Sequence, residues 1–165
     1  ISSLPCNCAP HKGRVNAGEF FMGVHAILAP AAVLVLWTLL MLIWTGATRF
    51  PAIAKSGLDL SKRPPGGRGQ DLDAILPPSV NWKSHNHTHL HEQPTLFYAV
   101  VAILAIGGGV TSLTVGLAWA YVALRIVHSF WQALVNTLPV RITLFFASTL
   151  CLLALAILAI LLTLA

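Results

Sequence analysis

The sequence predicts an all-α integral membrane protein, a single domain over 1–165 folded as a four-helix antiparallel bundle. Three observations predict this: an apolar composition, long runs without charge, and positive residues gathered in one loop. Hydrophobic residues make up 56% of the 165 residues and charged residues 9%, and the mean hydropathy is +0.77. Too little polar surface remains to cover a water-soluble globule, which excludes a soluble enzyme and a disordered chain.

Runs without charge supply the predicted membrane-spanning helices. The run 20–48 exceeds the roughly 20 residues that a helix needs to cross a bilayer. The next run, 93–124, is too long for one helix, and Gly107 to Gly109 within it favour a tight turn. The last run follows Pro139-Val140-Arg141, a typical start of a helix. The predicted spans are therefore 20–48, 92–108, 112–138 and 142–164.

The loop 49–91 is predicted to face the cytoplasm. Four spans place both termini on one side, with this loop and the turn 139–141 on the other. Cytoplasmic loops of membrane proteins carry an excess of Lys and Arg. The positive residues on the loop side are Arg49, Lys55, Lys62, Arg63, Arg68, Lys83 and Arg141, against Lys12 and Arg14 in the N-terminal tail. This placement explains the net charge of +5 and excludes a nucleic acid partner.

The long loop has two interpretations, because it exceeds the length of a plain connector. It is either an irregular segment over the end of the bundle or a lid over a site.

The three cysteines are expected to differ in role according to their location. Cys6 and Cys8 lie on the non-cytoplasmic side, where a disulfide within the pair or to another chain is chemically allowed. Cys151 is interpreted as a small packing residue of the fourth span.

Five polar residues of the third span fall on one helical face. They are Tyr121, Arg125, His128, Gln132 and Asn136. At 100° per residue these positions lie within about 80° of arc. The stripe is either a packing seam whose groups hydrogen-bond one another, or the wall of a polar cavity for an anionic or peptide-like ligand. An arginine near mid-helix favours a partner carboxylate.

Charged and imidazole groups gather at the loop-side ends of the first two spans. Arg49 ends the first span, where a helix C-terminus favours a cation without any ligand. Glu92 begins the second span beside a proline, where capping explains it, and an ion pair with Arg125 is the alternative.

Histidines occupy alternate positions from 85 to 91. In a helix, His85, His89 and Glu92 share one face and resemble a two-histidine, one-carboxylate metal set. The alternative is a row of interfacial or hydrogen-bonding imidazoles at the headgroup level, and we assign no metal ligand from this spacing. His25 is interpreted as an interhelical or cofactor-facing group.

The spans and their polar positions resemble the MAPEG family, the membrane-associated proteins of eicosanoid and glutathione metabolism, particularly its bacterial members. The similarity covers most of the chain. Its most specific segments are HLHEQPTLFYAV at 89–100, AYVALRIVHS at 120–129, Pro-Val-Arg at 139–141 and Thr-Gly-Ala-Thr-Arg at 45–49. The resemblance implies a homotrimer in the lipid bilayer, with glutathione between neighbouring subunits near the cytoplasmic leaflet.

The resemblance also implies roles for individual residues. Arg49 and Glu92 match residues that hold glutathione in the family's enzymes, and His128 matches a third-helix histidine of its prostaglandin E synthase branch. Arg141 matches the arginine that stabilises the glutathione thiolate, and it is the predicted catalytic residue. A guanidinium beside a sulfur favours the anion and lowers the thiol pKa. The predicted glutathione-binding set is completed by His89, Arg125 and Gln132.

Several positions depart from the family's pattern, and they leave two functions open. The departures are His89 for an asparagine, Thr88 for an arginine, Gln132 for a tyrosine, Ile142 for a hydroxyl residue and Phe145 for a tyrosine. The first function is a glutathione-dependent membrane transferase or peroxidase. The second is a noncatalytic structural or ligand-binding subunit of a larger membrane complex, in which the histidines leave pigment, haem or metal ligation open.

Overall fold

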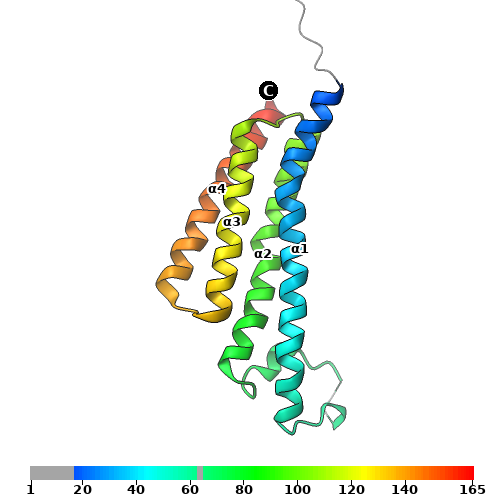
Figure 1. Ribbon diagram of the computed structural model, residues 1–165, viewed down its shortest axis with the longest axis vertical. Coiled ribbons are helices and arrows are strands. Elements are labelled where there is room, and N and C mark those ends of the chain that lie inside the picture. The colour runs from blue at the N-terminus through cyan, green and yellow to red at the C-terminus, as the bar shows by residue number, and fades with distance from the viewer. Residues whose placement is uncertain (1–16, 63–64) are drawn as a thin grey trace, which may run out of the picture.

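The computed structural model describes residues 17–62 and 65–165, and every regular element in this part of the chain is helical (Figure 1). Its four α-helices are α1 (Ala17–Lys55), α2 (Pro78–Ile106), α3 (Ser112–Leu134) and α4 (Leu138–Leu164). Two short 3-10 helices, η1 (Leu60–Lys62) and η2 (Gly69–Leu72), lie in the segment between α1 and α2. The predicted all-helical class is confirmed.

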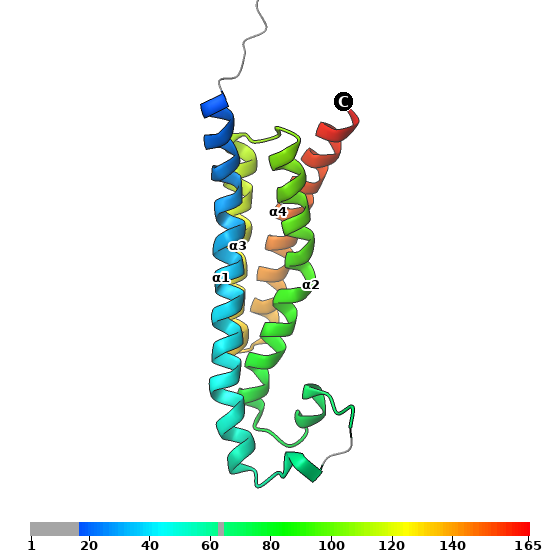
Figure 2. The same ribbon diagram turned by 90° about the vertical axis from the view of Figure 1, so that its right-hand side faces the viewer.

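The four helices lie side by side along one long axis (Figures 1 and 2). α1 packs chiefly on α2 and α3 chiefly on α4, while α2 also contacts α3 and α4. The start of α1, the turn after α2 and the C-terminus lie at one end, and the segment 56–77 lies at the other. One continuous apolar core joins the helices through residues that include Ile27, Leu34, Met41, Phe97, Val101, Tyr121 and Leu155.

Three of the four helices are long and apolar enough to cross a membrane, namely α1 from Gly23 onward, α3 and α4. This confirms the prediction of an integral membrane protein. α2 falls short by composition, because its first half carries the polar run around the histidines. The predicted span 92–108 is the second half of this longer helix, which begins at Pro78 with a proline in its first turn.

Helix boundaries differ from the predicted spans at several ends. α1 continues through Pro51 to Lys55, beyond the predicted end at 48. α3 ends at Leu134, and Asn136 adopts a left-handed backbone conformation (φ 59°) that breaks the helix before α4 begins at Leu138. The spans 112–138 and 142–164 remain predictions, whereas the helix itself breaks between Leu134 and Leu138. An uncharged sequence does not reveal such a break at a single asparagine.

The glycine turn after α2 lies where the sequence predicts it. Gly108 has a φ of 76°, which favours glycine. A Cβ added to Gly107 or Gly109 would stand 2.8 or 2.6 Å from Leu162 Cδ2, so the turn packs closely against the end of α4. Thr111 and Thr114 then form a reciprocal capping box that starts α3.

The described parts of the segment 56–77, residues 56–62 and 65–77, fold back against the ends of α1 and α2 (Figure 2). Leu72 and Leu76 pack on Ile53 of α1 in a small apolar cluster. The side-chain amide of Asn81 donates to the backbone carbonyls of Asp73 (2.7 Å) and Leu76 (3.3 Å). The segment therefore covers the end of the α1–α2 pair rather than the turn between α3 and α4.

Candidate functional site

A cavity of about 280 Å³ lies at the start of α4. His89 of α2 and His128 of α3 form one wall. The remaining lining residues come from α4 and are Leu138, Arg141, Ile142, Phe145 and Phe146. Ligand cavities in proteins typically measure roughly 300–1,000 Å³, so this cavity in a single chain fits a compact ligand or one end of a longer one.

Arg141 is the only charged side chain among the described residues that line this cavity. Its Nη1 donates a 2.8 Å hydrogen bond to Oδ1 of Asn136, the residue with the left-handed backbone. Its buried Nε has no partner among the described residues. The guanidinium is thus held in a defined position with the buried N–H of Nε unused, and a buried donor without an acceptor is unfavourable until an acceptor arrives.

Two imidazoles and a phenyl ring form the inner wall. The rings of His89 and His128 stack with centroids 5.2 Å apart, and Phe145 meets His89 edge-on at 5.6 Å. Arg125 lies behind this wall, fully buried, with its Cζ 5.2 Å from the Phe145 ring centroid. Its Nη1 is 3.4 Å from Nδ1 of His89, while its Nε and Nη2 have no partner in the described part of the chain.

The polar stripe of α3 is a packing seam over most of its length, and one of its residues, His128, lines the cavity. Tyr121, Arg125, His128 and Gln132 are all buried within the bundle. Toward the glycine turn the stripe is a packing seam, where Tyr121 reaches Gln93 (3.5 Å) and Gln93 donates to Thr149 (2.8 Å). Toward α4 it reaches the cavity at His128. Asn136 lies beyond the helix and joins the site through Arg141.

Glu92 does not reach Arg125, so the predicted alternative of an ion pair is wrong for this chain. Its side chain is 63% exposed and lies 3.8 Å from His89 at Oε2 to Nε2. The turn of α2 that directs His89 into the bundle directs Glu92, three residues later, toward its edge. Glu92 thus borders the site through His89 only.

Arg49 belongs to a separate network at the end of α1. Its Nη2 lies 3.1 Å from Oδ1 of Asp73, and it also donates to the Ser84 hydroxyl and the Gly69 carbonyl. The second oxygen of Asp73 lies 2.7 Å from Nε2 of His85. Asp73 was missed as a partner at the sequence level, although Arg49 needs an acid and the whole chain has only five.

A model of the MAPEG family matches residues 27–161. The chain belongs to the MAPEG family. The match extends across all four helices and includes the cavity and both arginine networks. No curated protein and no solved structure matches the chain at a significant level. Membership places this chain in a family of membrane proteins that includes glutathione-dependent transferases and noncatalytic members.

The residues of this MAPEG cavity fit the anionic and thiol groups of glutathione in part. Arg141 supplies a cationic donor in the lining through its unpartnered Nε. Arg125 and Gln132 are buried and also leave polar atoms without a partner among the described residues, but neither is among the residues that line the cavity. Ile142 and Phe145 present apolar surface where the resemblance implies hydroxyls. The cavity therefore offers a partner to an anionic group, but it does not offer partners to all the polar groups of a tripeptide.

The histidines of this MAPEG chain separate onto different faces of α2. His85 bonds Asp73 and His89 lines the cavity, whereas His87 and His91 pair on another face with ring centroids 4.5 Å apart. The described residues contain no group of three or more His, Cys, Asp or Glu placed around one metal ion. The metal set of His85, His89 and Glu92 is thus not assembled in this structure.

Three remaining sequence predictions concern residues away from the cavity. His25 is exposed on α1 and does not face the core. Cys151 is a free, half-buried thiol packed against the core on α4, as expected of a packing residue. Cys6 and Cys8 lie outside the described residues.

Proposed function

We propose that this protein is a glutathione-dependent membrane transferase or peroxidase in which Arg141 stabilises the reacting thiolate. The observation that carries the proposal is the Arg141 guanidinium in the cavity wall, oriented by Asn136 and retaining an unused buried N–H. Charge-assisted hydrogen bonds to such a group are stronger than neutral ones. An anion is the ligand that this arrangement favours.

Residues of α2, α3 and α4 have separate roles in binding and activating glutathione. Glutathione, when bound, supplies a nucleophilic sulfur. Arg141 favours the ionised thiol and thereby lowers its pKa. His89, His128 and Gln132 position the peptide from α2 and α3, and Arg125 makes the wall behind them electropositive. Glu92 lies at the outer edge of the site, where its carboxylate can accept from an amino group.

The arrangement in the membrane is part of the same proposal. All four helices, including the apolar half of α2, cross the bilayer antiparallel, with the segment 56–77 on the cytoplasmic side of a bacterial inner or organelle membrane. The chains form a trimer. Two observations support this: Arg49 lies outside the cavity of its own chain, and Leu138 and Phe146 on the cavity rim are 62% and 61% exposed. A neighbouring subunit would cover that rim and bring its Arg49 to it.

A second function, that of a noncatalytic subunit in a larger membrane complex, is favoured by one observation. Ile142 and Phe145 make the cavity more apolar than the family pattern implies, and one N–H of Arg141 is already satisfied by Asn136. A site of this kind holds a ligand without activating it. The histidines of the site would then be ligands of a bound cofactor.

The experiment that separates the two is a conjugation assay on the purified protein in lipid nanodiscs, with glutathione and 1-chloro-2,4-dinitrobenzene. The transferase proposal requires saturable, thiol-dependent turnover that Arg141→Leu abolishes and Arg141→Lys partly retains, because lysine keeps the charge but loses the planar fork. Arg68→Leu, at an exposed arginine of the loop, is the matched control. Turnover unaffected by Arg141→Leu would contradict the proposed role.

A further inference from the structure

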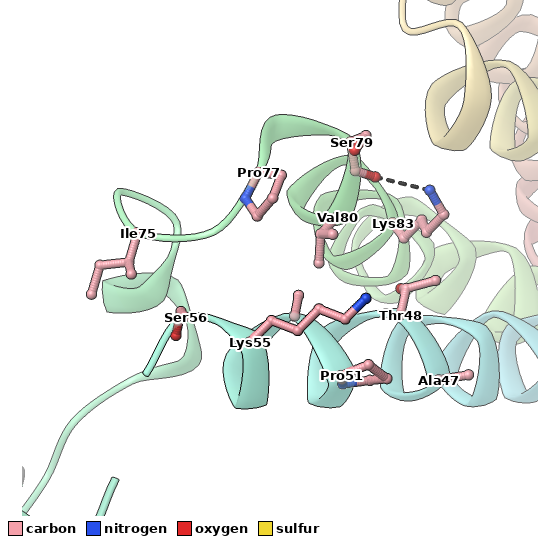
Figure 3. Close-up of a pocket in the computed structure, with 11 residues that line it drawn as sticks. Ala47, Thr48, Pro51, Lys55, Ser56, Ile75, Pro77, Ser79, Val80 and Lys83 are labelled. Atoms are coloured by element: carbon pink, nitrogen blue, oxygen red, sulfur yellow. Dashed lines mark hydrogen bonds between the residues drawn. The ribbon is translucent and has the colours of Figure 1, made fainter. Parts of the chain in front are cut away.

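A second and larger cavity, of about 660 Å³, lies between the end of α1, the start of α2 and the segment before α2 (Figure 3). It shares no lining residue with the cavity at α4. Ala47, Thr48 and Pro51 of α1 form its floor in this view, and Ile75, Pro77 and Val80 form the opposite side. The cavity is thus a separate feature of the loop end of the molecule.

This cavity is basic. Lys55 and Lys83 line it, and no described lining residue is acidic. Lys55, the last residue of α1, extends back along the helix toward Thr48, with its ammonium group between the two helices (Figure 3). It has no hydrogen bond or ion pair with any residue that the structure describes. Two cations without a counter-charge make an anion the complementary ligand.

Lys83 lies beside a tryptophan, which is typical of the membrane interface. Its Nζ donates to the Ser79 carbonyl (2.8 Å) and lies 5.3 Å from the ring centroid of Trp44. Tryptophans and lysines gather at the headgroup level, where an amphipathic ring meets charged groups. The cavity therefore opens at the height at which lipid headgroups lie.

An apolar groove continues from the basic cavity along α1. The groove has a volume of about 710 Å³ and shares Ala47 and Pro51 with the basic cavity. Leu42, Ile43 and Phe50 form much of its surface, and each is at least half exposed in the single chain. A charged cavity at headgroup level joined to an apolar groove toward the membrane centre matches an amphipathic anion with a long chain.

We propose that this cavity binds the phosphate of an anionic phospholipid between Lys55 and Lys83, with one acyl chain in the groove along α1. The ammonium groups and the hydroxyl of Ser79 receive the headgroup, whereas the Thr48 hydroxyl donates to the carbonyls of Trp44 and Thr45 in its own helix. The phosphate site uses none of the residues that line the α4 cavity. The groove includes Arg49, which the trimer proposal assigns to the cavity of a neighbouring subunit, so only the acyl-chain part of this inference depends on that proposal. Basic cavities between membrane helices on the cytoplasmic side are suited to anionic headgroups.

The test is native mass spectrometry of the full chain in detergent, titrated with phosphatidylglycerol or with phosphatidylcholine of identical acyl chains. We expect phosphatidylglycerol to bind more tightly, and Lys55→Gln and Lys83→Gln each to weaken it about fivefold. Lys62→Gln is the matched control, because Lys62 is an exposed lysine of the same end that pairs with Asp59. Equal affinity for the two lipids, or an equal loss in Lys62→Gln, would overturn the proposal.

Two further arms distinguish the source of the anion and the path of the chain. Millimolar inorganic phosphate should not displace the lipid, and displacement would make this a phosphate site instead. Gly46→Leu fills the groove and should weaken binding of both lipids, whereas Gly116→Leu, on the open surface of α3, should not. Oligomer dissociation by Gly46→Leu with unchanged lipid affinity would show that the groove is a subunit contact and the acyl-chain assignment wrong.

Discussion

At the scale of single residues, two arginines give the α4 cavity its character. Arg125 is fully buried and Arg141 half-buried, and together they leave three buried guanidinium nitrogens without a partner among the described residues. A buried cation without an acid costs several kcal/mol unless other groups compensate. Aromatic faces at Tyr121 and Phe145 offset part of this for Arg125. A bound anion would remove the remaining free-energy cost of burying these cations.

Restoring hydroxyl groups to the cavity should strengthen glutathione binding. Phe145→Tyr and Ile142→Ser each place a hydroxyl in the wall beside Arg141, and one neutral hydrogen bond corresponds to roughly threefold to tenfold in affinity. Isothermal titration with glutathione measures the change. Phe146→Tyr on the exposed rim is the control. Weaker binding in both restored variants would mean that the peptide does not lie against this wall.

The sequence predicts which residues belong to the site better than it predicts which residues they contact. The stripe from Tyr121 to Gln132 follows from helical periodicity, which is a local property. The pairing of Arg49 with Asp73 depends on how the segment 56–77 returns to α1, and no local pattern encodes that. The direction of Glu92 was missed for a related reason, because one helix face cannot be oriented before its neighbours are known.

At the scale of elements, the presence of the helices follows from the sequence, but the residues at which they begin and end do not. Long uncharged runs predict four helices, but α2 begins at Pro78, ahead of the polar run of histidines, because a proline can start a helix. The α3–α4 break rests on one left-handed asparagine. The loop is neither a plain connector nor a cover for the α4 cavity, because its Leu72 and Leu76 anchor it to α1.

Asp73→Asn should release this segment from the helices. The change removes the anion that holds both Arg49 and His85, and loss of charged hydrogen bonds of this kind costs roughly 1–3 kcal/mol. Thermal unfolding in detergent should shift to lower temperature, and tryptic cleavage after Arg68 should accelerate. Asp59→Asn is the control: Asp59 is exposed, and hydrogen bonds from Ser61 and Lys62 lower its pKa without tying it to α1 or α2. Equal effects of the two substitutions would refute the anchoring role of Asp73.

At the scale of the whole molecule, the excess of positive residues near the segment 56–77 predicts its side of the membrane. In a background without native cysteines, Ser61→Cys should react with a membrane-impermeant maleimide from the cytoplasmic side of sealed vesicles. Thr163→Cys, near the end of α4, should react from the opposite side. Labelling of both positions from the same side would contradict the predicted four-span topology.

A trimer with shared sites makes a distinct prediction about mixed subunits. If Arg49 of one chain serves the cavity of its neighbour, an Arg49→Ala chain and an Arg141→Leu chain are each inactive alone. Co-expressed in equal amounts, they should recover activity in about a quarter of the sites by random mixing. Mixtures as inactive as the single variants would place Arg49 outside the shared site.

The central claim, that the α4 cavity binds glutathione through Arg141, is tested most directly by equilibrium titration of the wild-type protein with glutathione in nanodiscs. We predict saturable binding at millimolar concentration or below, together with ultraviolet absorbance of the bound thiolate near neutral pH. Arg141→Leu should weaken the binding and remove that absorbance while the oligomer stays intact. Absence of saturable binding to the wild-type protein would contradict the account and leave the noncatalytic subunit as its function.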